Sequence, residues 1–376
     1  MKSHAQPTHA QKNRFMAEAI RLARKGAGMV SPNPLVGAVI VKDNEIVGRG
    51  YHGRYGGPHA EVSALQEAGE NALGADLYVN LEPCCHFGKT PPCTDVLIKR
   101  GIKRAFIGIQ DPNPLVGGKG LLALQKAGIE VETGILADKC RVLNEAFIKY
   151  ITCKVPFVAL KLAATLDGKI ATVTGDSQWI SGEAARRCVH RLRYEADALM
   201  VGIGTVIADN PLLTNRYYKT SHKRNPQRFI IDSRLRIPLS CRLLKTASEV
   251  KTVIATTQRA PKNKITKITQ RGAEVIIAPA QNGHVNLKHL MKLLAERGIS
   301  SVVIEGGAEL GAAALHYGIV DKVLFFFAPK IIGGRHARGM IGGDGVRKIA
   351  DAIRLSNMHC RKVGNDLLVE GYIANC

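Results

Sequence analysis

The sequence has few aromatic residues and no long apolar runs. Aromatic residues make up 5% of its 376 residues, and there is a single tryptophan. No apolar run reaches the roughly 18 residues that a membrane span requires. The first fifteen residues also lack the apolar stretch of a signal peptide. We therefore expect a soluble, cytoplasmic protein with no membrane partner.

The cysteines are not arranged as a disulfide framework. There are nine, an odd number, in a long chain without an export signal. Three of them, Cys84, Cys85 and Cys93, lie within a stretch of ten residues, which is typical of a metal site. The other six are scattered, and we expect them to be small core or surface residues.

Positive charge is abundant, and it is unevenly distributed. The formal net charge is +22. Residues 1–150 carry 19 Lys and Arg against 14 Asp and Glu, whereas residues 151–376 carry 34 against 17. A basic chain predicts an anionic partner. Because no tandem basic-aromatic motif is present, a phosphate-bearing substrate and cofactor fit this excess better than a nucleic acid does.

The hydrophobic pattern predicts two α/β domains, residues 1–150 and 151–376. The first domain begins with an apolar hairpin that turns at Asp43-Asn44. The helices and strands that follow it predict a mixed sheet with helices on both faces. A new apolar strand at 156–164 opens the second. The predicted helices are 13–25, 60–68, 94–99, 119–127, 182–194, 287–297 and 309–317. The predicted strands are 35–41, 45–51, 76–81, 104–109, 130–133, 156–164, 198–201, 229–232, 251–256, 274–278, 301–305 and 322–328.

A His-x-Glu motif and two spaced cysteines predict a catalytic zinc site. His59 and Glu61 open a predicted helix, Cys84 follows a strand, and Cys93 begins another helix. A catalytic zinc takes three Cys or His ligands and keeps its fourth position for water. In the zinc deaminase pattern, His59, Cys84 and Cys93 would bind the metal and Glu61 would act as general acid and base. Helix N-termini favour the thiolate form of cysteine.

The spacing of the two cysteines leaves a second interpretation open. Eight residues separate Cys84 from Cys93, instead of the two in the short pattern, and they include Cys85 and His86. We expect Cys84 to bind the metal and His86 to face the substrate. The alternative is a closed zinc knuckle made of all four residues, which would give the His59–Glu61 motif no role.

Four motifs of the first half resemble the RibD family of bifunctional riboflavin-biosynthesis enzymes. They are Ser31–Gly37, His59–Glu61, Glu82–Cys93 and Asp111–Pro114, and the long inter-cysteine loop ending in Thr-Pro-Pro-Cys is characteristic of that family. The resemblance implies a cytidine-deaminase-like domain with three α/β/α layers. It also implies that Asn33 helps to bind the pyrimidine, although an Asn before a proline is otherwise typical of a turn.

Two glycine-rich segments of the second half are candidates for binding a dinucleotide. Gly202-Ile-Gly204 lacks the third glycine of the Rossmann fingerprint, so it is a weak signal. Glu305-Gly-Gly307 lies between a predicted strand and a predicted helix, where backbone N–H groups can bind a phosphate. A simple strand-to-helix turn explains the second segment equally well.

The second half also resembles the RibD family, through Leu160–Lys169, Gly175–Ile180, Gly204–Thr214 and Ile304–Gly307. The resemblance implies a dihydrofolate-reductase-like α/β domain that uses NADPH. It implies cofactor contacts from Ala163, Trp179, Thr205, Asp209, Ser233 and Gly307, and substrate contacts from Ser177, Arg193, Leu213, Arg216 and Glu305. The two arginines would offer guanidinium forks to a ribose phosphate. Lys161 and Asp167 are candidate proton donors, although either could instead belong to a structural ion pair.

The resemblance implies two consecutive reactions. The first domain would hydrolyse the 2-amino group of 2,5-diamino-6-ribosylamino-4(3H)-pyrimidinone 5′-phosphate, using Zn²⁺. The second would reduce the ribosyl group to ribityl, using NADPH. We expect a homo-oligomer that binds no nucleic acid. Two alternatives remain: a nucleoside or nucleic-acid zinc deaminase with a noncatalytic basic domain, and a binding protein that keeps the folds without activity.

Overall fold

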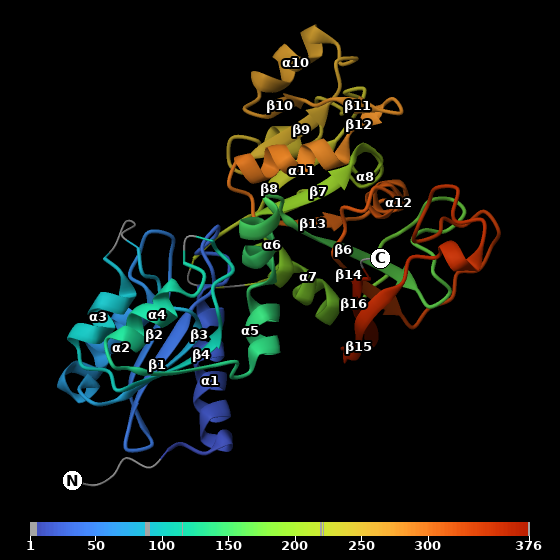
Figure 1. The fold of residues 1–376 in the computed structure, drawn as a ribbon. Helices are drawn as coiled ribbons and strands as arrows, with labels where there is room; N and C mark the ends of the chain where they lie inside the picture. Colours follow the sequence, from blue (N-terminus) through green and yellow to red (C-terminus); the bar gives the residue numbers. More distant parts are fainter. Residues whose placement is uncertain (1–5, 87–90, 115, 219, 221, 375–376) are drawn as a thin grey trace. The chain divides into compact units, whose positions relative to one another are not determined.

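The computed structural model describes residues 6–374 except 87–90, 115, 219 and 221. The chain divides into two compact units, Met1–Lys154 and Val155–Cys376. Within the described residues, no helix is both long enough and apolar enough to cross a bilayer. Each unit is built on one large sheet (Figure 1).

The first unit contains the predicted mixed sheet, with strands in the order β2-β1-β3-β4-β5. The strands are β1 (Gly37–Lys42), β2 (Glu45–Tyr51), β3 (Asp76–Leu81), β4 (Arg104–Ile109) and β5 (Glu130–Thr133). β1 runs antiparallel to β2 and β3, whereas β3, β4 and β5 are parallel. The hairpin turn is the predicted one, because Asp43 and Asn44 both have positive φ angles, 50° and 64°.

Helices cover both faces of this sheet, as predicted. One face carries α2 (Ala60–Ala68), α3 (Cys93–Lys99) and α4 (Lys119–Lys126). The other face carries α1 (His9–Ala23) and α5 (Ala137–Leu143). The short helices η1 (Arg24–Gly26) and η2 (Gly69–Ala72) extend α1 and α2, and α6 (Glu145–Cys153) ends the unit. The sequence pattern missed α5 and α6, because α5 buries one residue, Cys140, and α6 buries none.

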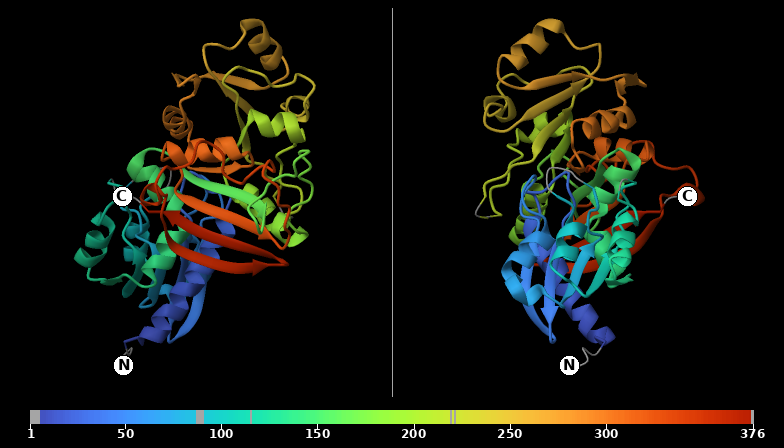
Figure 2. Two further views of the ribbon diagram at one scale, coloured as in Figure 1. Left: turned by 90° about the vertical axis from the view of Figure 1, so that its right-hand side faces the viewer. Right: turned by 60° about the vertical axis from the view of Figure 1, so that its left-hand side comes forward.

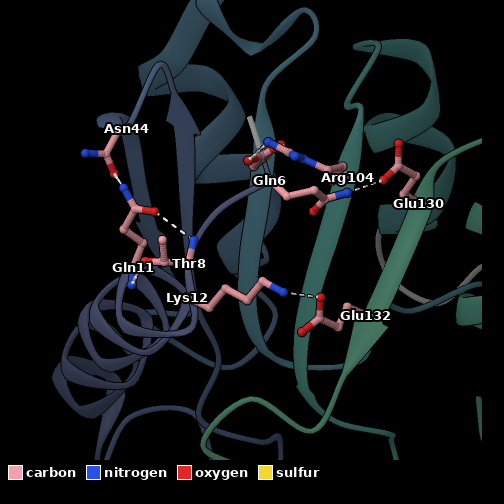
Figure 3. Close-up of polar contacts among 9 residues, drawn as sticks. Gln6, Thr8, Gln11, Lys12, Asn44, Arg104, Glu130 and Glu132 are labelled. Carbon is pink, nitrogen blue, oxygen red and sulfur yellow. Dashed lines mark hydrogen bonds and ion pairs between the residues drawn. The ribbon is translucent and has the colours of Figure 1, made fainter. Parts of the chain in front are cut away.

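Helix α1 begins before its predicted start because Thr8 caps it (Figure 3). Thr8 Oγ1 accepts a hydrogen bond from Gln11 N at 3.3 Å, and Gln11 Oε1 accepts one from Thr8 N at 2.8 Å. Gln11 Nε2 also donates to Asn44 Oδ1 at 2.9 Å, and Lys12 Nζ forms an ion pair with Glu132 at 2.6 Å. These contacts tie the helix to the β1–β2 turn and to the edge strand β5.

Two glycines of β2 allow α2 to lie very close to the sheet. A Cβ atom at Gly50 would lie 2.0 Å from Ala60 O, and one at Gly48 would lie 2.2 Å from Ala64 O. No side chain fits at such distances without moving the helix backbone. Because α2 begins directly after His59, these glycines determine where the His-x-Glu motif lies.

The second unit contains a nine-stranded sheet in the order β10-β9-β8-β7-β13-β6-β14-β16-β15. The seven strands from β10 to β14 in this order are parallel. The antiparallel hairpin β15–β16 forms one edge (Figure 2). The strands are β6 (Phe157–Thr165), β7 (Ala198–Gly202), β8 (Gln227–Ile231), β9 (Thr252–Thr256), β10 (Glu274–Ile277), β13 (Ser301–Glu305), β14 (Lys322–Ala328), β15 (Leu355–Val363) and β16 (Asp366–Ile373), with a separate ribbon of β11 (Ala280–Gln281) and β12 (His284–Val285).

Two apolar cores cover the two faces of this larger sheet. One packs against α7 (Glu183–Glu195), α8 (Ile203–Asp209), α9 (Arg242–Lys245) and α10 (Lys262–Thr269). The other packs against α11 (Leu287–Glu296) and α12 (Ala308–His316), and η3 (Ile349–Asp351) precedes β15. The sequence pattern missed α8, α9, α10 and the β15–β16 hairpin. β15 gives no alternating signal, because its residues are exposed along most of its length.

We expect Gly50→Ala to destabilise the first unit, because the new methyl group would force α2 away from β2. Overpacking of this kind costs about 1–3 kcal/mol. The first unit should therefore melt at least roughly 3 °C lower in differential scanning calorimetry. Gly53→Ala is the matched control, since its Cβ would meet only the end of the Tyr51 side chain, at 3.5 Å. Equal melting temperatures for the two variants would contradict the proposed close contact.

Candidate functional sites

Three predicted zinc ligands meet in the first unit. The ligand atoms of His59, Cys84 and Cys93 all lie within 4.8 Å of one another. His59 Nδ1 is 3.2 Å from Cys93 Sγ and 3.5 Å from Cys84 Sγ. Tetrahedral zinc with bonds of 2.0–2.3 Å separates its ligand atoms by roughly 3.6–3.8 Å. The donor set therefore fits a zinc ion after a small adjustment.

The fold brings these residues together at one edge of the parallel strands. Cys84 follows the carboxyl end of β3, His59 is the N-cap of α2, and Cys93 is the first residue of α3. Hydrogen bonds from the Cys93 thiol and from His59 lower the pKa of Cys84, despite its burial. The lowered pKa favours the thiolate form of Cys84, which is the form that binds zinc.

Glu61 is buried beside the cluster, in the first turn of α2. Its side chain is 3% exposed, and burial together with the nearby Cys84 thiolate raises the pKa of Glu61 to about 7. A carboxyl group with a pKa near neutrality can both accept a proton and return it during a reaction. Its position matches the predicted role of general acid and base.

A cavity of about 340 Å³ opens onto the cluster. His59, Glu61 and Cys84 line it, and so do Asn33 and His86. His86 therefore faces the cavity, as expected of a residue near the substrate. Within the described residues, the metal-binding cluster contains neither Cys85 nor His86, so the closed knuckle is not formed. Residues 87–90 of the inter-cysteine loop lie outside the described residues.

His52 is a pocket residue that the sequence pattern did not reveal. It follows β2 and belongs to no motif, but it lines the cavity and contacts Asn33. Its Nδ1 lies 2.9 Å from Pro58 O, and its Nε2 lies 3.2 Å from Asn33 Nδ2. Because a carbonyl oxygen can only accept, Nδ1 carries the hydrogen and Nε2 accepts from Asn33. Burial lowers the pKa of His52, which favours this neutral form.

Glu82 and Asp111 also line this cavity. The Glu82 carboxylate accepts hydrogen bonds from four backbone N–H groups, those of Asp111, Gly118, Gly120 and Leu121. It thereby holds the loop after β4 against the loop after β3. Burial raises the pKa of Asp111 to about 6. Both residues belong to quoted motifs, but their roles depend on contacts between separate strands.

In the second unit, some of the predicted residues lie at the carboxyl end of the parallel strand β13 and beside it. Glu305 ends β13, and Gly306 and Gly307 follow with φ angles of 64° and 80°. A Cβ atom at Gly307 would lie 3.1 Å from Thr205 Oγ1, so that hydroxyl group contacts the turn. Ligands of parallel α/β sheets bind at such strand ends, and α12 begins directly after the turn.

Arg193 and Glu305 bind each other, which differs from the expected free guanidinium fork. Arg193 Nε and Nη2 donate to the two carboxylate oxygens at 2.9 and 2.7 Å, and Nη1 donates to Thr214 O at 3.1 Å. The pair is buried, and each charge compensates the other where water is excluded. By contrast, the Arg216 side chain is exposed, and its backbone N–H donates to His190 Nδ1 at 2.9 Å.

One of the two candidate proton donors is excluded by its environment. Hydrogen bonds from Thr165 Oγ1 and from the backbone of Gly333 and Ile332 lower the pKa of Asp167 to about 2. Asp167 is therefore ionised at neutral pH and has no proton to donate. Lys161 remains a candidate: it pairs in register with Glu305, and burial lowers its pKa.

The other predicted contact residues of the second unit are spread over several elements. Ala163 lies on β6, Asp209 ends α8, and Leu213 is buried with a φ of 53°. Ser177 and Trp179 lie between β6 and α7. The Trp179 side chain is 60% exposed, and the Arg186 guanidinium group lies 4.8 Å from the centre of the Trp179 ring. Ser233 follows β8 and lines a separate cavity with Gly202 and Gly204. Of the six predicted cofactor contacts, Ser233 lines that cavity, and the other five do not: Ala163, Trp179, Thr205, Asp209 and Gly307.

Family models match both units. The model of the cytidine and deoxycytidylate deaminase zinc-binding region matches residues 9–109, and that of the RibD C-terminal domain matches residues 156–369. The riboflavin biosynthesis protein RibD of Actinobacillus pleuropneumoniae is 47% identical over 356 residues, covering 95% of this chain and 94% of the relative.

Two solved structures are similar over almost the whole chain. Acinetobacter baumannii RibD (form 1) has a TM-score of 0.87 at 37% identity, covering 98% of this chain and 100% of that one. A diaminohydroxyphosphoribosylaminopyrimidine deaminase/5-amino-6-(5-phosphoribosylamino)uracil reductase from Thermotoga maritima has a TM-score of 0.84 at 37% identity, covering 97% and 99%. The similarity thus extends through both units.

We expect the purified protein to hold one zinc ion per chain. His59→Ala and Cys93→Ser should lose it, because each removes one of three ligands. Cys85→Ser is the matched control and should keep the metal, since Cys85 lies outside the cluster. Inductively coupled plasma mass spectrometry measures the content. Loss of zinc from Cys85→Ser, with retention in His59→Ala, would instead support the closed knuckle.

Proposed function

This chain belongs to the RibD family of bifunctional riboflavin-biosynthesis enzymes, and on that basis we propose which reaction each of its two units catalyses. The first unit deaminates 2,5-diamino-6-ribosylamino-4(3H)-pyrimidinone 5′-phosphate by hydrolysis of its 2-amino group. The second unit reduces the ribosyl group of the product to ribityl with NADPH. The enzyme is therefore a deaminase and a reductase in one chain.

One observation supports the deaminase proposal most directly. Glu61 is buried beside the cluster of His59, Cys84 and Cys93, and an open cavity adjoins them. Zinc bound by these three residues would lower the pKa of a coordinated water to about 7. Glu61 accepts one proton from the attacking water and passes it to the ring nitrogen, and it then carries a second proton from the new hydroxyl group on the ring carbon to the amino group, which leaves as ammonia. The cavity wall formed by Asn33 and His86 holds the pyrimidine in place.

In the second unit, the residues position two molecules rather than form a covalent bond. NADPH supplies a hydride when it is bound. We assign cofactor contacts to Ala163, Trp179, Thr205, Asp209, Ser233 and Gly307, and substrate contacts to Ser177, Arg193, Leu213, Arg216 and Glu305. The exposed Arg216 is suited to the substrate phosphate. The Arg193–Glu305 pair holds the Glu305 carboxylate at the strand end, where sugar hydroxyl groups can donate to it.

The basic second half is explained by phosphorylated ligands. Both substrate and cofactor carry phosphate groups, and cationic side chains raise their local concentration. Relatives that align over 94–95% of this chain are named as riboflavin-biosynthesis proteins. This full-length relationship disfavours a nucleic-acid deaminase joined to a noncatalytic basic domain.

Incubation of the protein with the diaminopyrimidine phosphate tests both activities in one experiment. We expect ammonia release without cofactor, followed by oxidation of NADPH once it is added, seen as loss of absorbance. A reaction with cofactor but without pyrimidine is the control. Ammonia release without any later NADPH oxidation would contradict the reductase assignment.

We expect Glu61→Gln to release ammonia at least about 100-fold more slowly, because a glutamine cannot transfer the proton. The variant should keep its zinc, since Glu61 is not a ligand. It should also oxidise NADPH normally when it is given the deaminated pyrimidine. Unchanged ammonia release would defeat the assigned role of Glu61.

We expect Arg193→Lys to impair reduction and leave deamination intact. A lysine cannot form both hydrogen bonds to Glu305, so the KM for the deaminated pyrimidine should rise at least about tenfold. Arg187→Lys on the same helix is the matched control, because its partner Glu183 is exposed. If both variants reduced the substrate like the wild type, the pair would have no part in substrate binding.

A further inference from the structure

His190 is a buried residue of α7 to which the proposed reduction gives no part. Its side chain is 4% exposed, and it lies three residues before Arg193 on the same helix. Residues three apart share one face of a helix. His190 and Arg193 both contact the segment 213–218, which carries the proposed substrate contacts Leu213 and Arg216.

Two hydrogen bonds hold this segment against α7. Arg193 Nη1 donates to Thr214 O at 3.1 Å, and Arg216 N donates to His190 Nδ1 at 2.9 Å. The first bond uses a backbone acceptor of the segment, and the second uses a backbone donor two residues later. Because both groups belong to the main chain, the two bonds fix the path of the backbone at the point where the Arg216 side chain leaves it.

The hydrogen bond from Arg216 requires the neutral form of His190. A backbone N–H group can only donate, so Nδ1 must present its lone pair, and the ring hydrogen lies on Nε2. Burial, followed by the charges of Arg193 and Arg216, lowers the pKa of His190 to about 4, although Glu305 and Asn215 oppose this shift with smaller effects. The imidazole is therefore neutral at neutral pH and keeps its acceptor.

Side-chain packing restrains the segment on both sides of Arg216. The Tyr217 ring meets the His190 imidazole edge-on, with ring centres 4.7 Å apart and planes at 80°. The Arg216 guanidinium group lies 5.8 Å from the centre of the Tyr217 ring. Asn215 closes a turn, because its side chain accepts from Tyr218 N at 3.1 Å and donates to Tyr218 O at 3.0 Å.

The guanidinium group of Arg216 is available to an anion. It is exposed, and in the described part of the chain no ion pair neutralises it. Several arginines of α7 instead have carboxylate partners: Arg187, Arg191 and Arg193. A guanidinium group that is held in place but unpaired can bind a phosphate through two parallel hydrogen bonds.

We propose that His190 is a positioning residue for the reduction: its hydrogen bond to the backbone of Arg216 holds that guanidinium group where the substrate phosphate binds. This role rests on the proposed reductase function and adds a residue that no motif assigned to it. His190 acts through Arg216, because the Arg216 N–H already occupies its Nδ1. The part of substrate binding that depends on the phosphate therefore also depends on His190.

The role is tested with full-length protein and two substrates, the deaminated pyrimidine phosphate and the same compound without its phosphate. Oxidation of NADPH gives KM and kcat for each. His190→Leu removes the acceptor, whereas His190→Asn can offer its Oδ1 in place of Nδ1. Arg216→Gln is measured alone and together with His190→Leu. His289→Leu, at an exposed histidine of α11, is the control.

We expect His190→Leu to raise the KM for the phosphorylated pyrimidine at least about tenfold and to leave its kcat within about twofold of the wild type. The KM for the compound without phosphate should stay unchanged. His190→Asn should restore most of the lost affinity. Added to Arg216→Gln, His190→Leu should cause no further rise in KM, since the two residues act in series. The control should reduce both compounds as the wild type does.

An equal rise in KM for both compounds would overturn the proposed role, because it would show a general effect on the fold. A further rise in the Arg216→Gln background would also overturn it. If His190→Leu does not fold, His190→Gln replaces it, because the longer side chain carries its amide towards the position of Nε2 rather than Nδ1; an unchanged KM in that variant would again overturn the role. A wild-type protein that reduced neither compound would refute the reductase function itself.

Discussion

In both units, parallel strands end at one edge of a sheet, and the backbone that leaves them is held by buried polar contacts. In the first unit this arrangement brings a strand end and two helix N-termini to the same point, where His59, Cys84 and Cys93 converge. The position of His59, the N-cap of α2, depends on the close packing of α2 against β2. That contact depends on Gly48 and Gly50, which leave no side chain between helix and strand. The geometry of the cluster thus depends on a steric constraint in the sheet.

Buried charges complete each site by fixing the loops around it. Glu82 uses four hydrogen bonds to hold the loop after β4, while the Arg193–Glu305 pair stabilises a strand end in the second unit. Buried carboxylates are costly unless they are paired or hydrogen-bonded. Asp232 is the exception, because one of its oxygens has no partner among the described residues.

Much of the fold could be predicted from local pattern. The strands at 45–51, 76–81, 104–109, 301–305 and 322–328 have their predicted bounds, and so does the helix at 60–68. For these elements, strong apolar periodicity and glycines at the ends of elements were sufficient to predict the bounds. The pattern failed at α6, which buries no residue, and at β15, which is exposed along most of its length. Elements that contribute little to a core carry little hydrophobic signal.

The sequence alone determined the donor types of the metal site, the two-domain division and the family, because motif spacing and residue chemistry are local properties. Only the tertiary structure decided that Cys85 stays outside the cluster, that His52 supports Asn33, and that Asp167 is an ionised turn residue. It also showed that Arg193 is already bound to Glu305, 112 residues away in the chain. Pairings of this kind depend on which strand ends become neighbours, and strand order is set by the packing of the whole sheet.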